Sequence, residues 1–127
     1  MRNLPPVSES ELTLLQIIWA QGGTALYAQI MDALEQNQTT WKKNTVLTLL
    51  SRLVEKGYVT TSKLGRRNAY TALISDSDYQ TGQTKTFVEK IYQGNVKGLV
   101  STLLEQEILS ADDLAELNHY WQEVHHE

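Results

Sequence analysis

The chain has 127 residues, of which 41% are hydrophobic and 20% charged, and 15 acidic against 11 basic residues give a net charge of −4. These values fit one globular domain, or a small domain with a helical appendage, and exclude a disordered chain. The absence of cysteine excludes disulfide scaffolds, thiolate metal sites and cysteine nucleophiles. No apolar run is long enough to span a membrane, and Met1–Pro6 has no apolar signal core, so we expect a cytoplasmic protein.

The charge is distributed unevenly along the chain. Residues 1–75 hold eight basic and five acidic residues, whereas residues 76–127 hold three basic and ten acidic residues. Within residues 40–75 there are seven bases and one acid, Glu55. Such a block attracts a polyanion even when the whole protein is acidic, because electrostatic fields act locally. From charge alone, a solvated surface is an equally good explanation.

The first part of the chain predicts two amphipathic helices. Residues 8–11 read Ser-Glu-Ser-Glu, a capping box that predicts a helix from about Glu9 to Ala20, ended by Gly22 and Gly23. A second helix is expected between Thr24 and Gln36. Its apolar positions repeat at helical spacing, at Tyr27, Ile30, Met31 and Leu34.

Residues 42–56 predict a third helix with an unusual polar face. Steps of about 100° per residue place five residues within an arc of roughly 120°: Asn44, Thr45, Thr48, Ser51 and Arg52. The remaining arc is apolar and is expected to be buried: Val46, Leu47, Leu49, Leu50, Leu53 and Val54. Short polar groups permit close approach to a DNA groove and hydrogen bonding to it, and Lys42 and Lys43 add positive charge at the helix start. The alternative for Thr45 and Thr48 is an ordinary exposed helix surface.

The next segment predicts a β-hairpin with a basic tip. Residues 58–62 and 69–74 are rich in β-branched and aromatic residues, and Gly65 permits a turn between them. The connecting residues 63–68 carry Lys63, Arg66 and Arg67, for which the alternative is a solvated turn. Three helices followed by a basic hairpin is the order of a winged helix-turn-helix, in which the third helix enters the major groove. The expected fold is therefore mainly α with a small β-hairpin.

Residues 76–127 predict three further amphipathic helices, the first starting at Asp76–Asp78. Their apolar stripes have little else in this segment to cover them, which favours a second copy of the chain over packing against residues 1–75. We therefore expect a winged-helix DNA-binding domain in residues 1–75 and a helical dimerisation region in residues 76–127. The residues expected at the dimer interface are Phe87, Ile91, Val96, Leu99, Val100, Leu103, Leu114, Leu117 and Trp121.

Motifs spread over nearly the whole chain match one known family. They are Ser8–Leu12, Ile17–Trp19, Trp41, Thr45-Val46, Leu50–Gly57, Gly65-Arg66, Tyr70-Thr71, Ser77–Tyr79 and Tyr92–Gly94. In these segments the chain resembles the penicillinase-repressor family, the BlaI/MecI/CopY group of bacterial transcriptional repressors. The resemblance implies a homodimeric repressor that binds an inverted-repeat operator in double-stranded DNA. It also implies that the recognition helix presents Asn44, Thr45, Thr48 and Arg52. Trp41 precedes this helix and is expected mainly to pack against the helices.

Three features depart from that family. Family members often have Pro where this chain has Lys43, which suggests a different operator preference. The β-lactam-responsive members are cleaved at an Asn–Phe bond, and the matching position here is Thr102-Leu103, which argues against a sensor protease of that kind. The copper-responsive members use a Cys-x-Cys motif, which a chain without cysteine lacks. Release from DNA by a ligand or by proteolysis both remain open.

No catalytic or cofactor motif is present. The chain has no phosphate-binding glycine loop and no Gly-x-Ser-x-Gly motif, so we expect neither an enzyme nor a cofactor. No metal site is expected from His119, His125 and His126, because adjacent histidines cannot form a helical i, i+4 pair together. The alternative function is a winged-helix module that binds other proteins and no specific DNA.

Overall fold

The computed structural model describes residues 4–125. Residues 1–3, part of the segment considered above for a signal sequence, and His126 and Glu127 lie outside the described residues. The elements follow in the order α1 (Glu9–Ala20), β1 (Thr24–Leu26), α2 (Tyr27–Gln36), α3 (Lys43–Lys56), β2 (Val59–Leu64), β3 (Arg67–Ala72), α4 (Asp76–Tyr92), α5 (Val96–Glu105) and α6 (Ala111–Val124). Within the described residues, no helix is both long and apolar enough to cross a membrane.

The first and third helices lie where the sequence predicts them. In the capping box of α1, the backbone N–H of Glu11 donates to Ser8 Oγ at 3.2 Å, and the N–H of Ser8 donates to Glu11 Oε1 at 2.8 Å. The third helix ends at Gly57, whose φ of +89° lies in the left-handed region that favours glycine. Both boundaries therefore follow from residues whose preferences act locally.

The expectation of a helix starting at Thr24 is wrong for its first three residues. These residues form β1, which pairs antiparallel with β3 in the register Thr24↔Thr71, Ala25↔Tyr70 and Leu26↔Ala69. The sheet order is β1-β3-β2, so β1 adds a third strand to the hairpin. A partner 47 residues away in sequence, fixed in part by a 2.9 Å hydrogen bond between the Thr24 and Thr71 hydroxyls, overrides the local helical pattern.

The hairpin is confirmed, with longer strands and a shorter turn than expected. Strands β2 and β3 pair as far as Leu64↔Arg67, so only Gly65 and Arg66 form the turn. The φ of Gly65 is +66°, as a two-residue turn with glycine in the first position requires. Lys63, Arg67 and Asn68 consequently belong to strands, where pairing fixes the side of the hairpin on which each lies.

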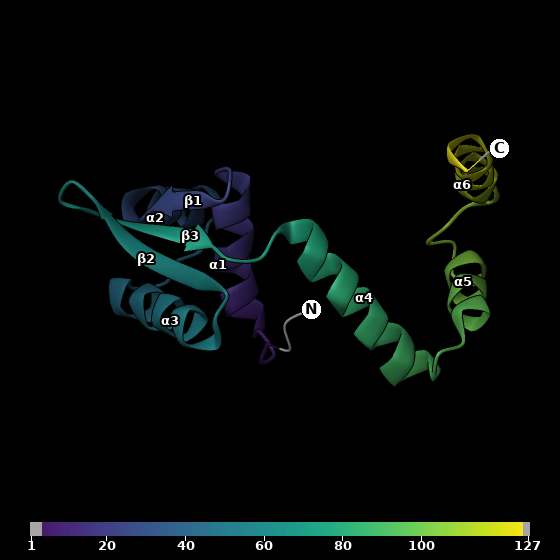
Figure 1. The fold of residues 1–127 in the computed structure, drawn as a ribbon, viewed down its shortest axis with the longest axis horizontal. Coiled ribbons are helices and arrows are strands. Elements are labelled where there is room, and N and C mark those ends of the chain that lie inside the picture. Colours follow the sequence, from purple (N-terminus) through teal and green to yellow (C-terminus); the bar gives the residue numbers. More distant parts are fainter. Residues whose placement is uncertain (1–3, 126–127) are drawn as a thin grey trace. The chain divides into compact units, whose positions relative to one another are not determined.

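One core joins the three helices and the sheet (Figure 1). Its largest fully buried aliphatic side chains come from α1, α2, α3 and β2: Leu14, Leu15, Ile18, Ile30, Leu34, Val46, Leu50, Leu53 and Val59. Trp41 is half-buried against this core, as expected from its position before α3. Figure 1 also shows the turn of the hairpin projecting beyond the helices. The predicted fold class, mainly α with a small antiparallel sheet in a winged-helix arrangement, is confirmed.

Contacts divide the chain into two compact units, residues 1–80 and 81–127. The first turn of α4 belongs with the first unit. There the Trp19 indole N–H donates to the Ile74 carbonyl at 2.9 Å, and the ring of Tyr79 lies 5.7 Å from that of Trp19 and 6.2 Å from that of Tyr58, centroid to centroid. Helix α4 continues past this cluster into the second unit, where α5 and α6 follow.

Candidate nucleic-acid interface

Helix α3 presents a continuous polar surface. Asn44, Thr45, Thr48, Ser51 and Arg52 are all exposed, and the buried residues of the helix lie on its opposite side. A shallow depression of about 320 Å³ is lined by Asn44, Thr45, Thr48 and Arg52 together with Leu49. The structure therefore brings the four predicted reading residues onto one surface.

The start of α3 adds two cations to this surface. Lys42 is the N-cap residue and Lys43 is the first helical residue, and both side chains are exposed. Lys42 makes no side-chain hydrogen bond to the helix end, so the first N–H groups of α3 are not capped by it. Free N–H groups at a helix start, next to positive side chains, form a favourable environment for an anion.

The apolar side of α3 is less completely buried than the helical wheel predicts. Val54 is 37% exposed and Leu47 is only half-buried. The physical reason is a hollow of about 380 Å³ between α3 and the hairpin, lined by Leu47, Ser51, Val54, Glu55, Thr61 and Tyr70. This side of the helix faces the sheet across a gap.

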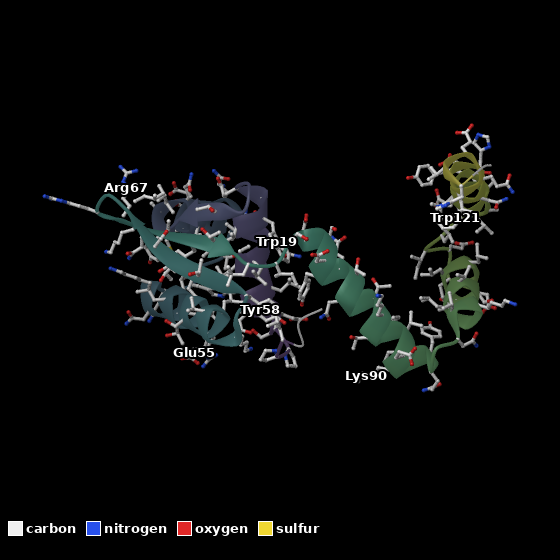
Figure 2. All side chains as sticks on the ribbon, viewed as in Figure 1. Trp19, Glu55, Tyr58, Arg67, Lys90 and Trp121 are labelled. Carbon is white, nitrogen blue, oxygen red and sulfur yellow. The ribbon has the colours of Figure 1, made fainter. Side chains whose placement is uncertain are left out.

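The structure separates the predicted cations of the hairpin. Successive side chains of a strand alternate between its two faces, and the register pairs Lys63 with Asn68 and Leu64 with Arg67. Lys63 therefore shares the face of Thr61, which borders the hollow beside α3, whereas Arg67 lies on the other face. Arg66 lies in the turn, and Figure 2 shows Arg67 at the outer end of the hairpin.

None of the cations of the α3 surface and the hairpin forms an ion pair with an acid within residues 4–125. The ion pairs there join Lys56 to Glu11 and His119 to Glu123. Six basic side chains are thus free to attract an external anion: Lys42, Lys43, Arg52, Lys63, Arg66 and Arg67. Lys56, which the charge count included in the basic block, is used internally.

The C-terminal end of α3 is fixed by contacts that the sequence did not reveal. Lys56 Nζ donates to Glu11 Oε1 at 2.6 Å and to the Pro6 carbonyl at 2.8 Å, and the Tyr58 hydroxyl donates to the Pro5 carbonyl at 2.6 Å. Glu11 is only 1% exposed. These bonds join α3 to α1 and to the segment before it, and so hold the polar surface of α3 in a defined orientation.

Burial and hydrogen bonding shift several pKa values in this unit. Burial alone would raise the pKa of Glu11, but hydrogen bonds from Lys56 and Ser8 and the charge of Lys56 outweigh it, so the pKa lies below 4.5. Burial raises the pKa of Tyr58, Tyr70 and Tyr79 above 10.0. Glu11 is therefore ionised at neutral pH, and the three phenols are neutral.

One residue of the polar surface was missed. Glu55 lies at about 20° on the wheel that begins at Asn44, inside the predicted arc, and its side chain is exposed. It was counted only as the single acid of the basic block. On that wheel it falls between Asn44 and Thr48, among the reading residues.

The second unit exposes most of the residues predicted for a dimer interface. No described residue of α4, α5 or α6 is buried. Phe87 is 47% exposed and Trp121 is 61% exposed, and Ile91, Val96, Leu114 and Leu117 are likewise exposed, whereas Leu99, Val100 and Leu103 are half-buried. Three further exposed apolar residues of this unit lie outside the predicted interface: Ile108, Tyr120 and Val124.

The histidines make local contacts on α6. His119 Nε2 lies 3.3 Å from Glu123 Oε1, and the ring of His125 lies 3.6 Å from that of Trp121. No group of three or more residues of the kinds that hold metal ions is found among the described residues. His126 lies outside them.

Comparison with known proteins places nearly the whole chain in one family. The family described as Penicillinase repressor matches residues 7–123. The penicillinase repressor of Bacillus licheniformis is 31% identical over 117 residues, which cover 92% of this chain and 90% of that protein. The methicillin resistance regulatory protein MecI of Staphylococcus aureus is 33% identical over 113 residues, covering 87% of this chain and 89% of MecI.

Solved structures match part of the chain. The solution structure of the DNA-binding domain of the repressor BlaI superposes with a TM-score of 0.52 at 33% identity, covering 62% of this chain and 94% of that domain. The monomeric form of B. licheniformis BlaI in complex with the blaP half-operator gives the same values. The resemblance seen in the sequence is thereby confirmed: this chain belongs to the penicillinase repressor family.

Proposed function

We propose that this chain is a homodimeric, sequence-specific transcriptional repressor that binds an inverted-repeat operator. In this proposal the first unit binds DNA and residues 76–127 form the dimer, and the protein acts in the cytoplasm without enzymatic activity or a cofactor. The observation that supports it best is the joint exposure of a polar α3 surface and of cations, at the start of α3 and in the hairpin, that form no ion pair within residues 4–125. A relative at 33% identity has been solved on a half-operator with the same fold.

The first unit supplies two kinds of DNA contact. Asn44, Thr45, Thr48 and Arg52 read base edges from the major groove, because their side chains are exposed on one face of α3. Cations around them bind phosphates and set the register of the protein on the duplex: Lys42, Lys43, Lys63, Arg66 and Arg67. Replacing Thr48 by Ala is expected to cost about 1–3 kcal/mol at one base pair, and an unchanged sequence preference would contradict this role.

The second unit supplies the dimer contact. A segment of this length with no buried residue in its three helices does not have a core of its own. Exposed apolar residues repeated along these helices mark an interaction site, and a second copy of the chain provides a complementary stripe. A two-fold dimer also matches the two-fold symmetry of an inverted repeat.

The first experiment is fluorescence anisotropy with DNA from upstream of the protein's own gene and its neighbours, with excess unrelated DNA and at two salt concentrations. Saturable binding that survives the competitor and weakens with salt is expected, because phosphate contacts release counterions. Binding that the competitor abolishes would leave only non-specific attraction. No binding at low salt would favour the alternative, a module that binds other proteins.

The signal that releases the protein from DNA is a separate question. Thr102 and Leu103 lie within the helix α5, where the Thr102 hydroxyl donates to the Gly98 carbonyl at 3.0 Å. A regular helix is a poor protease substrate because its backbone is not extended. This geometry supports the view that cleavage at the bond between Thr102 and Leu103 is not the release mechanism. The test is to incubate the DNA complex with cell extract and to measure the size of the protein chain, which is expected to stay unchanged.

A further inference from the structure

We propose that Glu55 determines specificity at the outermost base pair that α3 reaches, where its carboxylate accepts a hydrogen bond from the amino group of cytosine. This inference rests on the proposed function, since it assigns a role within the same DNA-binding surface. Figure 2 shows Glu55 on α3, in the same unit as the cationic hairpin. It is the single acid among residues 40–75.

The first argument is position. Asn44, Thr48, Ser51 and Glu55 follow one another along one stripe of α3, and all four side chains are exposed. Glu55 lies about 4.5 Å along the helix axis from Arg52, at 1.5 Å per residue. This distance is close to the rise of about 3.4 Å between neighbouring base pairs, so the two side chains reach adjacent pairs when the helix lies in the groove.

The second argument is the absence of a structural role. Among the described residues, no basic side chain forms an ion pair with Glu55, although Arg52 and Lys56 are near it in sequence. Lys56 is directed instead to Glu11 and Pro6. Towards the hairpin, Glu55 borders the hollow that Ser51 and Thr61 also line, and no hairpin cation is among the residues that line it. An acid in the last turn of a helix is moreover unfavourable for the helix dipole.

The third argument is chemical complementarity. A carboxylate next to phosphates repels them and therefore weakens non-specific binding, in which the protein contacts only the DNA backbone. In the major groove, cytosine presents an N4 amino donor, and Glu is one of the side chains that accept from it. Arg52 offers only donors and Glu55 only acceptors. Together, Arg52 and Glu55 therefore favour DNA sites in which a guanine that Arg52 contacts lies next to a cytosine that Glu55 contacts. Binding in a register that brings Glu55 next to a phosphate is weakened.

The test compares Glu55→Gln with a matched control, Glu35→Gln. Glu35 is also an exposed acid in the last turn of a helix, and no cation forms an ion pair with it within the described part of the chain. Both variants remove one negative charge from the first unit. Anisotropy with the full-length protein measures affinity for an operator fragment and for a scrambled duplex of equal length, and substitution of each operator base pair maps the sequence preference.

We expect Glu55→Gln to bind the scrambled duplex several-fold more tightly and the operator no more tightly, so that the ratio of the two affinities falls about ten-fold. The preference for cytosine at one base pair is expected to weaken, because the Gln amide can donate to other bases as well as accept from cytosine. Glu35→Gln should leave both the ratio and the preference unchanged. The thermal midpoint of Glu55→Gln should be equal to or above that of the wild type, which excludes misfolding as the cause.

Two different failures can be told apart. Specific binding by the wild-type protein with an unchanged affinity ratio in Glu55→Gln overturns the role of Glu55 and leaves the proposed function standing. No specific binding by the wild-type protein overturns the proposed function, and the role of Glu55 with it. An equal fall in the ratio for Glu35→Gln would show that only overall charge matters, and would also overturn this inference.

Discussion

The ammonium of Lys56 lies 2.6 Å from Oε1 of Glu11, and this pair joins the end of α3 to the first turn of α1. Glu11 is almost completely buried, whereas Lys56 retains 27% of its side-chain exposure. Ser8 and Pro6 satisfy further hydrogen-bonding positions of the pair. The proposed recognition helix is thus fixed at its C-terminal end by a charged contact with the scaffold, while its polar surface, from Asn44 to Glu55, remains exposed.

Replacement of Glu11 by Gln is expected to lower the free energy of unfolding by about 1–3 kcal/mol, because it leaves the charge of Lys56 without its partner in a partly buried site. The pKa of Glu11 is lower in the folded protein than its ordinary value of 4.5. The contribution of the pair is therefore fully present above pH 4.5 and is lost as the pH falls through the lowered pKa. Urea unfolding at a series of pH values measures both effects.

The exposed Glu9 of the same helix turn provides the control. Glu9→Gln should change the unfolding free energy by less than about 0.5 kcal/mol, the usual range for surface substitutions. Wild type and Glu9→Gln should lose stability in parallel below pH 4.5, whereas Glu11→Gln should show a smaller loss there. Parallel acid unfolding of Glu11→Gln and the wild type would contradict the assignment of this titration to Glu11.

The hairpin cations are expected to contribute mainly to the salt dependence of DNA binding. The double variant Arg66→Ala, Arg67→Ala should reduce the slope of log K against log salt by about 0.9 for each phosphate contact that is lost. The same two-residue change at Lys90 and Lys97, on α4 and α5, serves as the control and should leave the slope unaltered. A hairpin variant with the wild-type slope would show that the hairpin does not contact phosphates.

Lys63 offers a finer version of this experiment. It lies on the hairpin face that borders α3, whereas Arg67 lies on the opposite face. If the face next to α3 approaches the backbone, Lys63→Ala should lower both the affinity and the slope more than Arg67→Ala does. Equal effects from the two single variants would mean that both faces of the hairpin lie near the DNA.

Local signals explain which parts of the fold could be predicted. The capping box at Ser8 and the glycine at position 57 act on neighbouring residues, so the limits of α1 and α3 were readable from the sequence. Strand β1 has three residues, too few for an alternating pattern, and it exists because β3 offers a free edge. Its pairing is a long-range event that the helical periodicity of residues 24–36 concealed.

In the candidate site, too, local features could be predicted from the sequence and long-range contacts could not. Helical periodicity alone identified the polar face of α3, whose predicted residues are all exposed. Periodicity could not show that Lys56 pairs with Glu11, because the two residues are 45 positions apart. Nor could it show that a hollow separates Val54 from the hairpin, since the width of that gap depends on how the sheet packs. Glu55 was readable from the same periodicity, but it had been considered only as the single acid of residues 40–75.

The aromatic cluster at the start of α4 is expected to stabilise the first unit. Trp19→Phe removes the indole N–H that donates to the Ile74 carbonyl, and should lower the unfolding free energy by about 1 kcal/mol. Tyr79→Leu removes ring contacts with Trp19 and Tyr58, and should cost a similar amount. Denaturant unfolding followed by circular dichroism measures both variants, and Tyr92→Leu, whose ring contacts Phe87 in the second unit, is the comparison.

Because Trp19 and Tyr79 are in contact, their effects should not add. The double variant is expected to be more stable than the sum of the two single losses predicts, by about 0.5–1.5 kcal/mol. Strict additivity would show that the two rings act independently. The contact between Trp19 of α1 and Tyr79 of α4 would then contribute nothing to stability.

The exposed stripe of α6 provides the most direct test of the dimer. Leu117→Asp places a charge on the stripe formed with Leu114 and Trp121, and should convert the dimer to a monomer at low micromolar concentration, since an unpaired charge cannot be buried there. Ala115→Asp adds the same charge on the other side of the helix and should leave the dimer intact. Sedimentation equilibrium distinguishes one 14.4 kDa chain from two.

Operator binding then connects the dimer with the proposed function. A monomer that retains a folded first unit should bind a half-site about as well as the wild-type protein, but should lose most of its affinity for the full inverted repeat, because the second half-site is no longer bound from a tethered partner. Wild-type affinity of Leu117→Asp for the full repeat, at concentrations where it sediments as a monomer, would show that the two half-sites are bound independently. The apolar stripe of α6 would then require a partner other than a second copy of this chain.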